Sequence, residues 1–301
     1  MVPLVYHPDY SFAFPRDHRF TMSKFKLTYE NLVRYGLVHN NLFTPEKPEI
    51  EQFHLAHDPG YVKALCKNTL DEKAWRRIGL PFSEQLIHRT LIAPAGTLLA
   101  SKLALEHGVA CHIGGGTHHA HYSFGSGFCL LNDLAFSSLA LNQMKPDLKI
   151  LIFDLDVHQG DGTASILKNE KNIYTVSVHC EKNFPYRKET STVDVGLYAG
   201  MSDDEYLTIV ESTLNESISR FSPDIVLYDA GVDIWEHDKL GLLNISWQGI
   251  FERDKLVFEK FKQAGIPIAS VIGGGYDPDE HELARRHSIV FEAANSVFNV
   301  L

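Results

Sequence analysis

The run Asp-Leu-Asp-Val-His-Gln-Gly-Asp-Gly, at residues 154–162, brings two kinds of metal-binding side chain close together in the chain. Asp156 and His158 are two residues apart, so on extended backbone both side chains project to the same side. A carboxylate and an imidazole in that arrangement can hold one metal ion. The alternative is a turn in which acidic side chains cap the following helix, and Asp161 before Thr163 is placed to do so.

Asp233 is the candidate third ligand, at the end of the loop Asp-Ala-Gly-Val-Asp, residues 229–233. Taken alone, an aspartate after a strand caps a helix or faces solvent more often than it binds a metal. Two carboxylates and one imidazole leave coordination positions open, which is typical of catalytic rather than structural metal sites. Zn²⁺ fits this set of ligands, and ligand softness also permits Fe²⁺.

Two adjacent histidines, His118 and His119, follow a glycine triplet in the run Gly-Gly-Gly-Thr-His-His-Ala, residues 114–120. An adjacent pair arises about once by chance in a chain of this composition, but the glycines also let backbone approach a ligand closely. One imidazole can take a proton from metal-bound water, while the other stays charged and stabilises developing negative charge. Asp154 and Asp161 remain available to fix the tautomers of the pair.

Two further glycine-rich runs present aromatic side chains. Gly-Gly-Gly-Tyr, at residues 273–276, predicts that the phenol of Tyr276 donates to an oxyanion, although a turn with a packing tyrosine fits equally well. Gly-Ser-Gly-Phe-Cys, at residues 125–129, predicts that Phe128 walls a narrow channel. Cys129 fits a small buried hydrophobe better than a nucleophile.

The elements that must position these residues are short apolar runs, rich in β-branched residues, that suit strands buried on both faces. They are Val109–Ile113, Ile150–Asp154, Ile173–Val178, Ile225–Tyr228 and Ile268–Ile272. Helical patterns lie before and between them, at Ser83–His107, Asp203–Phe221 and Ser246–Gln263. This alternation predicts one α/β domain over residues 1–301, with a mainly parallel sheet and helices on both faces. Because such sheets bind ligands beyond the carboxyl ends of their strands, the candidate runs fall where chemistry is expected.

Composition and charge exclude several classes of protein. The chain has 301 residues, 44% hydrophobic and 22% charged, which is globular usage and excludes disordered, collagen-like and coiled-coil proteins. The net charge is −10 and no cluster of five or more Lys and Arg occurs, so a direct nucleic-acid ligand is disfavoured. The same net charge favours cationic substrates, such as lysine-bearing peptides or polyamines.

The four cysteines show no Cys-x-x-Cys spacing, which predicts neither a disulfide framework nor a structural zinc motif. We therefore expect a reducing, cytoplasmic location. The first residues lack the basic-then-apolar pattern of a signal peptide. The longest mostly apolar stretch, Leu91–Leu105, contains Pro94, Gly96 and Lys102, so no membrane insertion is expected.

Five motifs occur in order along the chain, and together they resemble the histone deacetylase family of the arginase/deacetylase superfamily. They are Gly-Gly-Gly-Thr-His-His-Ala, Gly-Phe-Cys-x-x-Asn-Asp, Asp-x-Asp-x-His-x-Gly-Asp-Gly, Ala-Gly-x-Asp and Gly-Gly-Gly-Tyr. The resemblance covers essentially the whole chain. The compact length and the stretches Tyr6–Pro8, Leu91–Leu105 and Asp229–Ser246 are most similar to the class IV branch and its bacterial relatives. One departure from that branch is Asp161, where the branch can carry an amide.

The resemblance implies a role for each candidate residue. It implies that zinc is held by Asp156, His158 and Asp233, and that the catalytic residues are His119 as general base and acid, His118, Tyr276, Asp154 and Asp161. It implies an acyl-lysine tunnel at Gly127, Phe128, Phe184, Gly274 and Gly275. It also implies a monovalent cation, K⁺ or Na⁺, held by Asp154 and by main-chain oxygens of Asp156, His158, Ser177 and Val178. The segment 17–20 resembles a family segment near an internal channel.

The function implied by this resemblance is zinc-dependent removal of acyl groups from Nε-acyl-lysine in proteins or peptides, with no serine or cysteine nucleophile. Acetylpolyamine amidohydrolases and acetoin-utilisation-type deacetylases perform the same chemistry on other amines and remain alternatives. A two-manganese ureohydrolase is disfavoured, because Asp229 and Asp233 do not form the further Asp-x-Asp pair that it needs. A non-enzymatic binding module is disfavoured, because the candidate ligands, both histidines and Tyr276 are all present.

Overall fold

The computed structural model describes residues 1–298, and eight strands in these residues form one sheet in the order β2-β1-β3-β8-β7-β4-β5-β6. Each neighbouring pair is parallel. The strands are β1 (Leu4–Val5), β2 (Leu42–Phe43), β3 (Val109–His112), β4 (Ile150–Asp154), β5 (Ile173–Cys180), β6 (Val193–Leu197), β7 (Ile225–Asp229) and β8 (Ile268–Val271).

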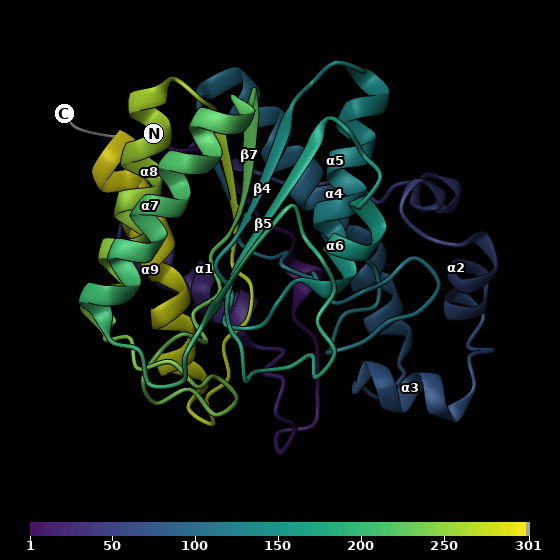
Figure 1. Ribbon diagram of the computed structural model, residues 1–301. Helices are drawn as coiled ribbons and strands as arrows, with labels where there is room; N and C mark the ends of the chain where they lie inside the picture. Colours follow the sequence, from purple (N-terminus) through teal and green to yellow (C-terminus); the bar gives the residue numbers. More distant parts are fainter. Residues whose placement is uncertain (299–301) are drawn as a thin grey trace.

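Helices cover both faces of this sheet. Figure 1 shows α1, α7, α8 and α9 on one side of it and α4, α5 and α6 on the other. The α-helices are α1 (Lys24–Arg34), α2 (Pro59–Cys66), α3 (Glu72–Ile78), α4 (Glu84–His107), α5 (Asp133–Met144), α6 (Asp161–Leu167), α7 (Asp203–Phe221), α8 (Trp247–Ala264) and α9 (Glu280–Phe298), and two short 3₁₀ helices are η1 (Pro8–Tyr10) and η2 (Ile50–Leu55). The predicted α/β architecture is confirmed.

Local signals set the ends of the predicted helices. The side chain of Ser83 accepts a hydrogen bond from the Leu86 N–H at the start of α4, and Gly108 ends that helix with a φ of +84°. Ser246 caps α8 in the same way by accepting from the Gly249 N–H, so α8 begins one residue later than predicted. The strand predictions agree with the structure to within one or two residues at each end.

Neither the short strands nor several of the helices follow from the sequence patterns. β1 and β2 have two residues each, too few to show a period; β1 pairs with β3, and β2 joins the sheet by pairing with β1. β6 is an edge strand whose first four residues alternate between half-buried and exposed, so it lacks the continuous apolar run that identified the central strands. α1, α2, α3, α5, α6 and α9 were also not predicted.

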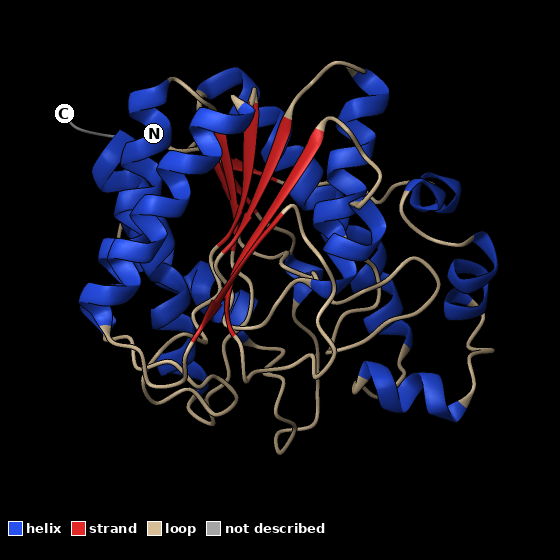
Figure 2. Cartoon of the chain, in the orientation of Figure 1, coloured by secondary structure: helices blue, strands red, loops and turns tan. Residues whose placement is uncertain are grey.

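The order of the central strands positions the site. β3, β8, β7 and β4 are consecutive in the sheet and wholly buried, and they are the strands that precede the candidate runs. Their carboxyl ends face one side of the molecule, and Figure 2 shows most of the loops gathered on that lower side. Runs as far apart in the chain as residues 114–120 and 273–276 therefore meet at one edge of the sheet.

No helix within residues 1–298 is long and apolar enough to cross a membrane.

Candidate active site

The loops that follow β3 and β8 pack backbone against backbone. A Cβ atom added at Gly116 would lie 2.4 Å from the Cα of Gly273, and both residues have positive φ values, +79° and +57°. Only glycine accepts that backbone conformation at so close an approach. The two glycine triplets therefore allow the histidine pair and Tyr276 to approach the same point.

The candidate metal ligands converge beyond β4 and β7. One ligand atom from each of Asp156, His158 and Asp233 lies within 4.8 Å of the others, and all three side chains are buried. The Nδ1 atom of His158 is 3.0 Å from Oδ1 of Asp156 and 3.0 Å from Oδ2 of Asp233. Backbone N–H groups orient both carboxylates: Gly274 donates to Oδ2 of Asp156, and Val157 donates to Oδ1 of Asp233.

The donor set fits a divalent cation. Burial and the neighbouring Asp156 raise the pKa of Asp233 to about 7, because two carboxylates so close together resist being charged at once. Burial disfavours the charged form of His158, but hydrogen bonds from its ring to the carboxylates of Asp156 and Asp233 outweigh that effect and raise its pKa to about 10. The pocket thus attracts positive charge at one point, as a Zn²⁺ site requires.

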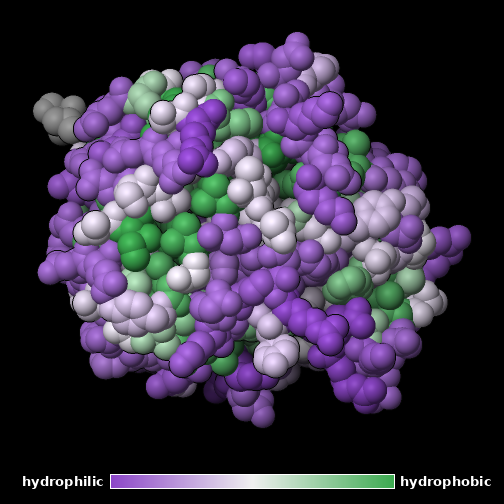
Figure 3. Space-filling model, viewed as in Figure 1, coloured by the Kyte–Doolittle hydropathy of each residue, from purple (hydrophilic) through white to green (hydrophobic). Residues whose placement is uncertain are grey.

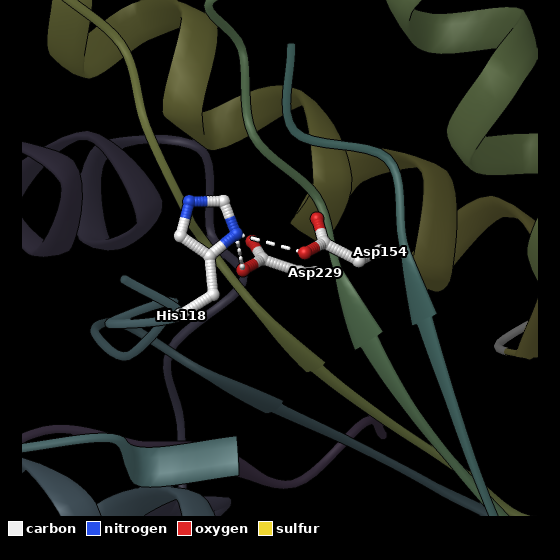
Figure 4. Close-up of side chains that lie close together, drawn as sticks. All are labelled: His118, Asp154 and Asp229. Carbon is white, nitrogen blue, oxygen red and sulfur yellow. Dashed lines mark hydrogen bonds and ion pairs between the residues drawn. The ribbon is translucent and has the colours of Figure 1, made fainter. Parts of the chain in front are cut away.

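The carboxylates around His118 are shown in Figure 4, where its ring points at both Asp154 and Asp229. Nδ1 of His118 lies 2.8 Å from Oδ2 of Asp154 and 3.8 Å from Oδ2 of Asp229, and all three side chains are buried. Burial lowers the pKa of His118, but the charges of Asp154 and Asp156 outweigh it and hold that pKa well above its ordinary value. The imidazole of His118 is therefore positively charged near neutral pH.

Asp229 is a buried member of this cluster that the sequence analysis did not assign to the site. Neither of its carboxylate oxygens has a hydrogen-bond partner among the described residues, and burial raises its pKa well above the usual value. The sequence held a signal for it, since it directly follows the predicted strand run Ile225–Tyr228. In the structure it pairs with Asp154 in the β4–β7 register.

His119 contacts a different carboxylate. Nδ1 of His119 lies 2.6 Å from Oδ1 of Asp161, whose Oδ2 lies 3.1 Å from Nε2 of His121. Burial and the charge of His118 lower the pKa of His119 to about 4, against the opposing effect of Asp161. The imidazole is thus neutral near pH 7 and free to accept a proton. Asp161 begins α6 but makes no capping hydrogen bond there, so the capping alternative does not describe it.

A polar network behind the histidine pair holds the loop in place. Asn132 donates through Nδ2 to the carbonyl oxygens of His118 and Ala120, and its own N–H donates to Nε2 of buried His57. Asp133 accepts from the backbone N–H groups of Gly116 and Thr117. Asn132 and Asp133 belong to the motif Gly-Phe-Cys-x-x-Asn-Asp, but no role was predicted for them. No sequence pattern pointed to His57.

Two cavities meet at this centre. The outer one has a volume of about 440 Å³ and includes the predicted tunnel residues Gly127, Phe128 and Phe184 together with His119, His158 and Tyr276. The inner one, about 30 Å³, shares His119, Gly127, Phe128 and Tyr276 with it and also contains Gly274, Phe20, Lys24 and Arg89. Lys24 and Arg89 are buried cations with no sequence signal, and burial lowers the pKa of Lys24 to about 8.

Tyr276 lies between the metal ligands and the tunnel aromatics. Its ring centroid is 5.8 Å from that of Phe128 and 6.2 Å from that of His158. Burial and the nearby charges of Asp233 and Asp156 raise the pKa of Tyr276 well above its ordinary value, so the phenol keeps its proton and can donate it in a hydrogen bond.

The remaining predicted site residues occupy different places. Gly275 is not among the described residues that line either cavity; a Cβ there would meet Val232, Leu283 and His287 instead. Ser177 pairs with Asp154 in the β4–β5 register, and its hydroxyl lies 3.0 Å from Nδ1 of His179. Val178 is buried next to it in β5.

The sequence of this chain is similar to those of known proteins over most of its length. A model of the family described as "Histone deacetylase domain" matches residues 18–293. The chain is 47% identical to an uncharacterized protein of Picosynechococcus sp., over 98% of this chain and 99% of that protein. It is 30% identical to Histone deacetylase 2 of Arabidopsis thaliana, over 91% and 74%, and 29% identical to the Acetoin utilization protein AcuC of Staphylococcus aureus, over 88% and 74%.

Two solved structures share the fold. The HD domain of HDA15 superposes with a TM-score of 0.80 at 19% identity, covering 100% of this chain and 91% of that one. An HDAC homologue crystallised with SAHA also gives a TM-score of 0.80, at 22% identity, covering 99% and 88%.

Proposed function

The chain belongs to the histone deacetylase family, and we propose that it hydrolyses Nε-acyl-lysine amides with a zinc ion held by Asp156, His158 and Asp233. Family membership makes the protein a hydrolase of the deacetylase type, from a metal-dependent family that acts on acetylated substrates. The residue roles and the acyl-lysine substrate are the proposal.

The zinc ion, when bound, supplies Lewis acidity and lowers the pKa of a coordinated water. His119 is the general base: its neutral imidazole takes a proton from the attacking water and later gives a proton to the leaving amine. Asp161 orients that imidazole through the 2.6 Å contact at Nδ1, which leaves Nε2 to face the reaction.

The oxyanion is the second requirement. Tyr276, which keeps its proton, donates a hydrogen bond to the carbonyl oxygen as negative charge develops there. His118 carries a positive charge because Asp154 raises its pKa. That charge stabilises the negative charge that develops on the carbonyl oxygen. Asp154 would in addition hold a K⁺ or Na⁺ ion with main-chain oxygens of Asp156, His158, Ser177 and Val178, a role supported by the pairing of β4 with β5.

The observation that carries this proposal is the position of Nδ1 of His158, 3.0 Å from carboxylate oxygens of both Asp156 and Asp233, in a cavity that also contains His119 and Tyr276. This cavity therefore combines a metal-binding set with a proton carrier and an oxyanion donor.

The test is turnover by zinc-loaded protein with its metal content quantified. We expect hydrolysis of lysine peptides that carry acyl groups, in a series from acetyl to long fatty acyl chains. Acetylated polyamines in the same assay decide the alternative suggested by similarity to an acetoin utilization protein. Folded, zinc-loaded protein that hydrolyses polyamine amides but none of the lysine peptides would overturn the proposed substrate.

We further propose that residues 1–301 act as one catalytic domain, in the cytoplasm, with class IV enzymes as the nearest branch. The proposal rests on the family match over residues 18–293 and on the one sheet that joins all the described strands. It also rests on the free state of all four cysteines.

A further inference from the structure

Basic side chains surround the mouth of the outer cavity. Its lining includes Arg19, Arg76, Arg77 and Lys182, and no carboxylate among the described residues belongs to it. These four residues are all exposed. They come from three separate segments: the loop before α1, the end of α3 and the loop after β5. We call these four residues the basic rim.

The basic rim contrasts with the acidic chain, whose net charge is −10. Figure 3 shows strongly hydrophilic side chains crowded along the lower part of the face, on the side where Figure 1 places α3 and the loops. Arg19 and Lys182 make no ion pair within the described part of the chain, whereas Arg76 lies 2.9 Å from Glu72. The guanidinium of Arg77 lies 4.5 Å from the ring centroid of Phe124, a contact that leaves its charge uncompensated.

The charges near the mouth of the outer cavity, rather than the net charge of the chain, decide which ligands are attracted there. At physiological ionic strength the Debye length is about 8 Å, so exposed charges farther away are largely screened. A ligand that enters the outer cavity lies among the rim cations, while the acidic residues that give the chain its net charge lie outside the lining. At the mouth, the lining side chains therefore favour negative charge, the opposite of what net charge alone predicts, whereas the metal ligands deeper in the site attract positive charge.

We propose that the basic rim selects acyl-lysine peptides with acidic residues on both sides of the modified lysine; this inference rests on the proposed function. A peptide fits better than a small anion, because a small anion needs donors that converge on one point. The rim charges instead come from three segments, and Arg76 is already paired with Glu72. The acyl-lysine itself occupies the tunnel of Phe128 and Phe184, so its neighbours in the peptide reach the rim.

The rim acts on capture rather than on chemistry. None of its side chains is a candidate metal ligand or proton carrier, so its charges should change kcat/KM more than kcat. Attraction between exposed charges raises association rates by about 10–1,000-fold at low salt and weakens steeply as salt rises. A preference produced by the basic rim must therefore depend on ionic strength.

The experiment compares two peptides with the same acyl-lysine, one flanked by glutamates and one by lysines, on zinc-loaded full-length protein. A third peptide with glycine flanks measures basal deacylation. We expect kcat/KM for the glutamate peptide to exceed that for the lysine peptide by at least about tenfold at low salt, and the ratio to approach one in 0.5 M salt. Equal values at low salt, or a preference for the lysine flanks, would overturn the inference.

Charge-reversal variants locate the effect. The double variant Arg19→Glu, Lys182→Glu should reduce or invert the preference for glutamate flanks. The matched control, Lys168→Glu with Lys171→Glu, makes the same change in net charge at exposed positions between α6 and β5, outside the cavity lining, and it should keep the preference. A preference that survives in the rim variant would show that these side chains do not cause it. If no acyl peptide is hydrolysed, including the glycine-flanked one, the proposed function fails instead.

Discussion

His118 and His119 are adjacent in the chain, with ring centroids 4.1 Å apart, yet their surroundings drive their pKa values in opposite directions. Burial opposes charge on both rings. Asp154 and Asp156 overcome that effect at His118, whereas the charge of His118 adds to it at His119. The result near neutral pH is one positive and one neutral imidazole beside a single metal site, which divides the electrostatic and proton-transfer roles between them.

The first prediction compares the proton carrier with the oxyanion donor. His119→Ala should lower kcat more than Tyr276→Phe, because His119 moves protons in two steps while Tyr276 supplies one hydrogen bond. One such donor is worth about 10²–10³ in kcat. Both variants should keep their zinc, as measured by elemental analysis. If the kcat of Tyr276→Phe were within about twofold of the wild-type value, Tyr276 would be a packing residue and not an oxyanion donor. Removal of such a donor lowers kcat far more than twofold.

The second prediction concerns the metal ligands. Asp233→Ala removes an anionic ligand from a buried set of three, so zinc affinity should fall by more than the roughly 10–100-fold typical of outer-shell changes. Activity should fall with it. The control is Asp204→Ala, at an exposed position in the first turn of α7, which should keep wild-type zinc content. Full zinc occupancy in the Asp233 variant would reject the ligand assignment.

The third prediction uses a glycine as a probe of the site. A Cβ at Gly274 would lie 2.1 Å from Oδ2 of Asp233 and 2.6 Å from Oδ2 of Asp156, so Gly274→Ala must displace the carboxylates. We expect zinc affinity to fall by about 10–100-fold. Gly200→Ala is the control: its Cβ would meet nothing within 4 Å, so the cost is backbone strain at a φ of +84°, about 1–2 kcal/mol. Equal zinc affinities in the two variants would contradict the contact at Gly274.

The fourth prediction is a pH dependence of stability from His57. Nδ1 of His57 lies 3.0 Å from the His121 carbonyl oxygen, and its Nε2 accepts from Asn132, so the neutral ring satisfies both contacts. Burial lowers the pKa of His57 to about 4, from 6.5 in the unfolded chain. Because the unfolded state then binds more protons, stability should fall as the pH drops from 6.5 toward 4, and His57 should account for about 3 kcal/mol of that fall.

Urea unfolding measured from pH 7 to pH 4.5 checks this expectation. His57→Gln should flatten the fall in unfolding free energy, whatever its effect on absolute stability. His39→Gln, at an exposed position, should leave the slope as in the wild type. Parallel slopes in the wild type and the His57 variant would exclude His57 as the source.

The fifth prediction concerns thiol chemistry. Cys129 lies beside the tunnel but is 5% exposed, and burial raises its pKa to about 12, so almost no thiolate is present at neutral pH. Iodoacetamide should modify the half-buried Cys66 first and leave deacylation unchanged. Loss of activity at the rate of Cys129 modification, followed by mass spectrometry, would indicate a cysteine mechanism.

The sequence alone determined the local features of this protein. Continuous apolar runs identify strands buried on both faces, and serines with glycines identify the ends of α4 and α8, because these signals act within a few residues. Asp156, His158 and Asp233 were also predicted as metal ligands from the sequence, because they are carboxylates and an imidazole that follow predicted buried strands. The ability of these side chains to bind a metal depends on their residue types, which can be read directly from the sequence.

Only the tertiary structure decided which of these features meet. The order β3-β8-β7-β4 arises from pairing between distant segments, and no local pattern encodes it. That order places Asp229 against His118, 111 positions away in the chain, and leaves its carboxylate without a hydrogen-bond partner in the described structure. The folded chain likewise brings Arg19, Arg77 and Lys182 to one cavity, although the chain as a whole is acidic. Net charge sums over the whole molecule, whereas a pKa or a ligand responds to charges within a few ångströms, and those distances exist only in the folded protein.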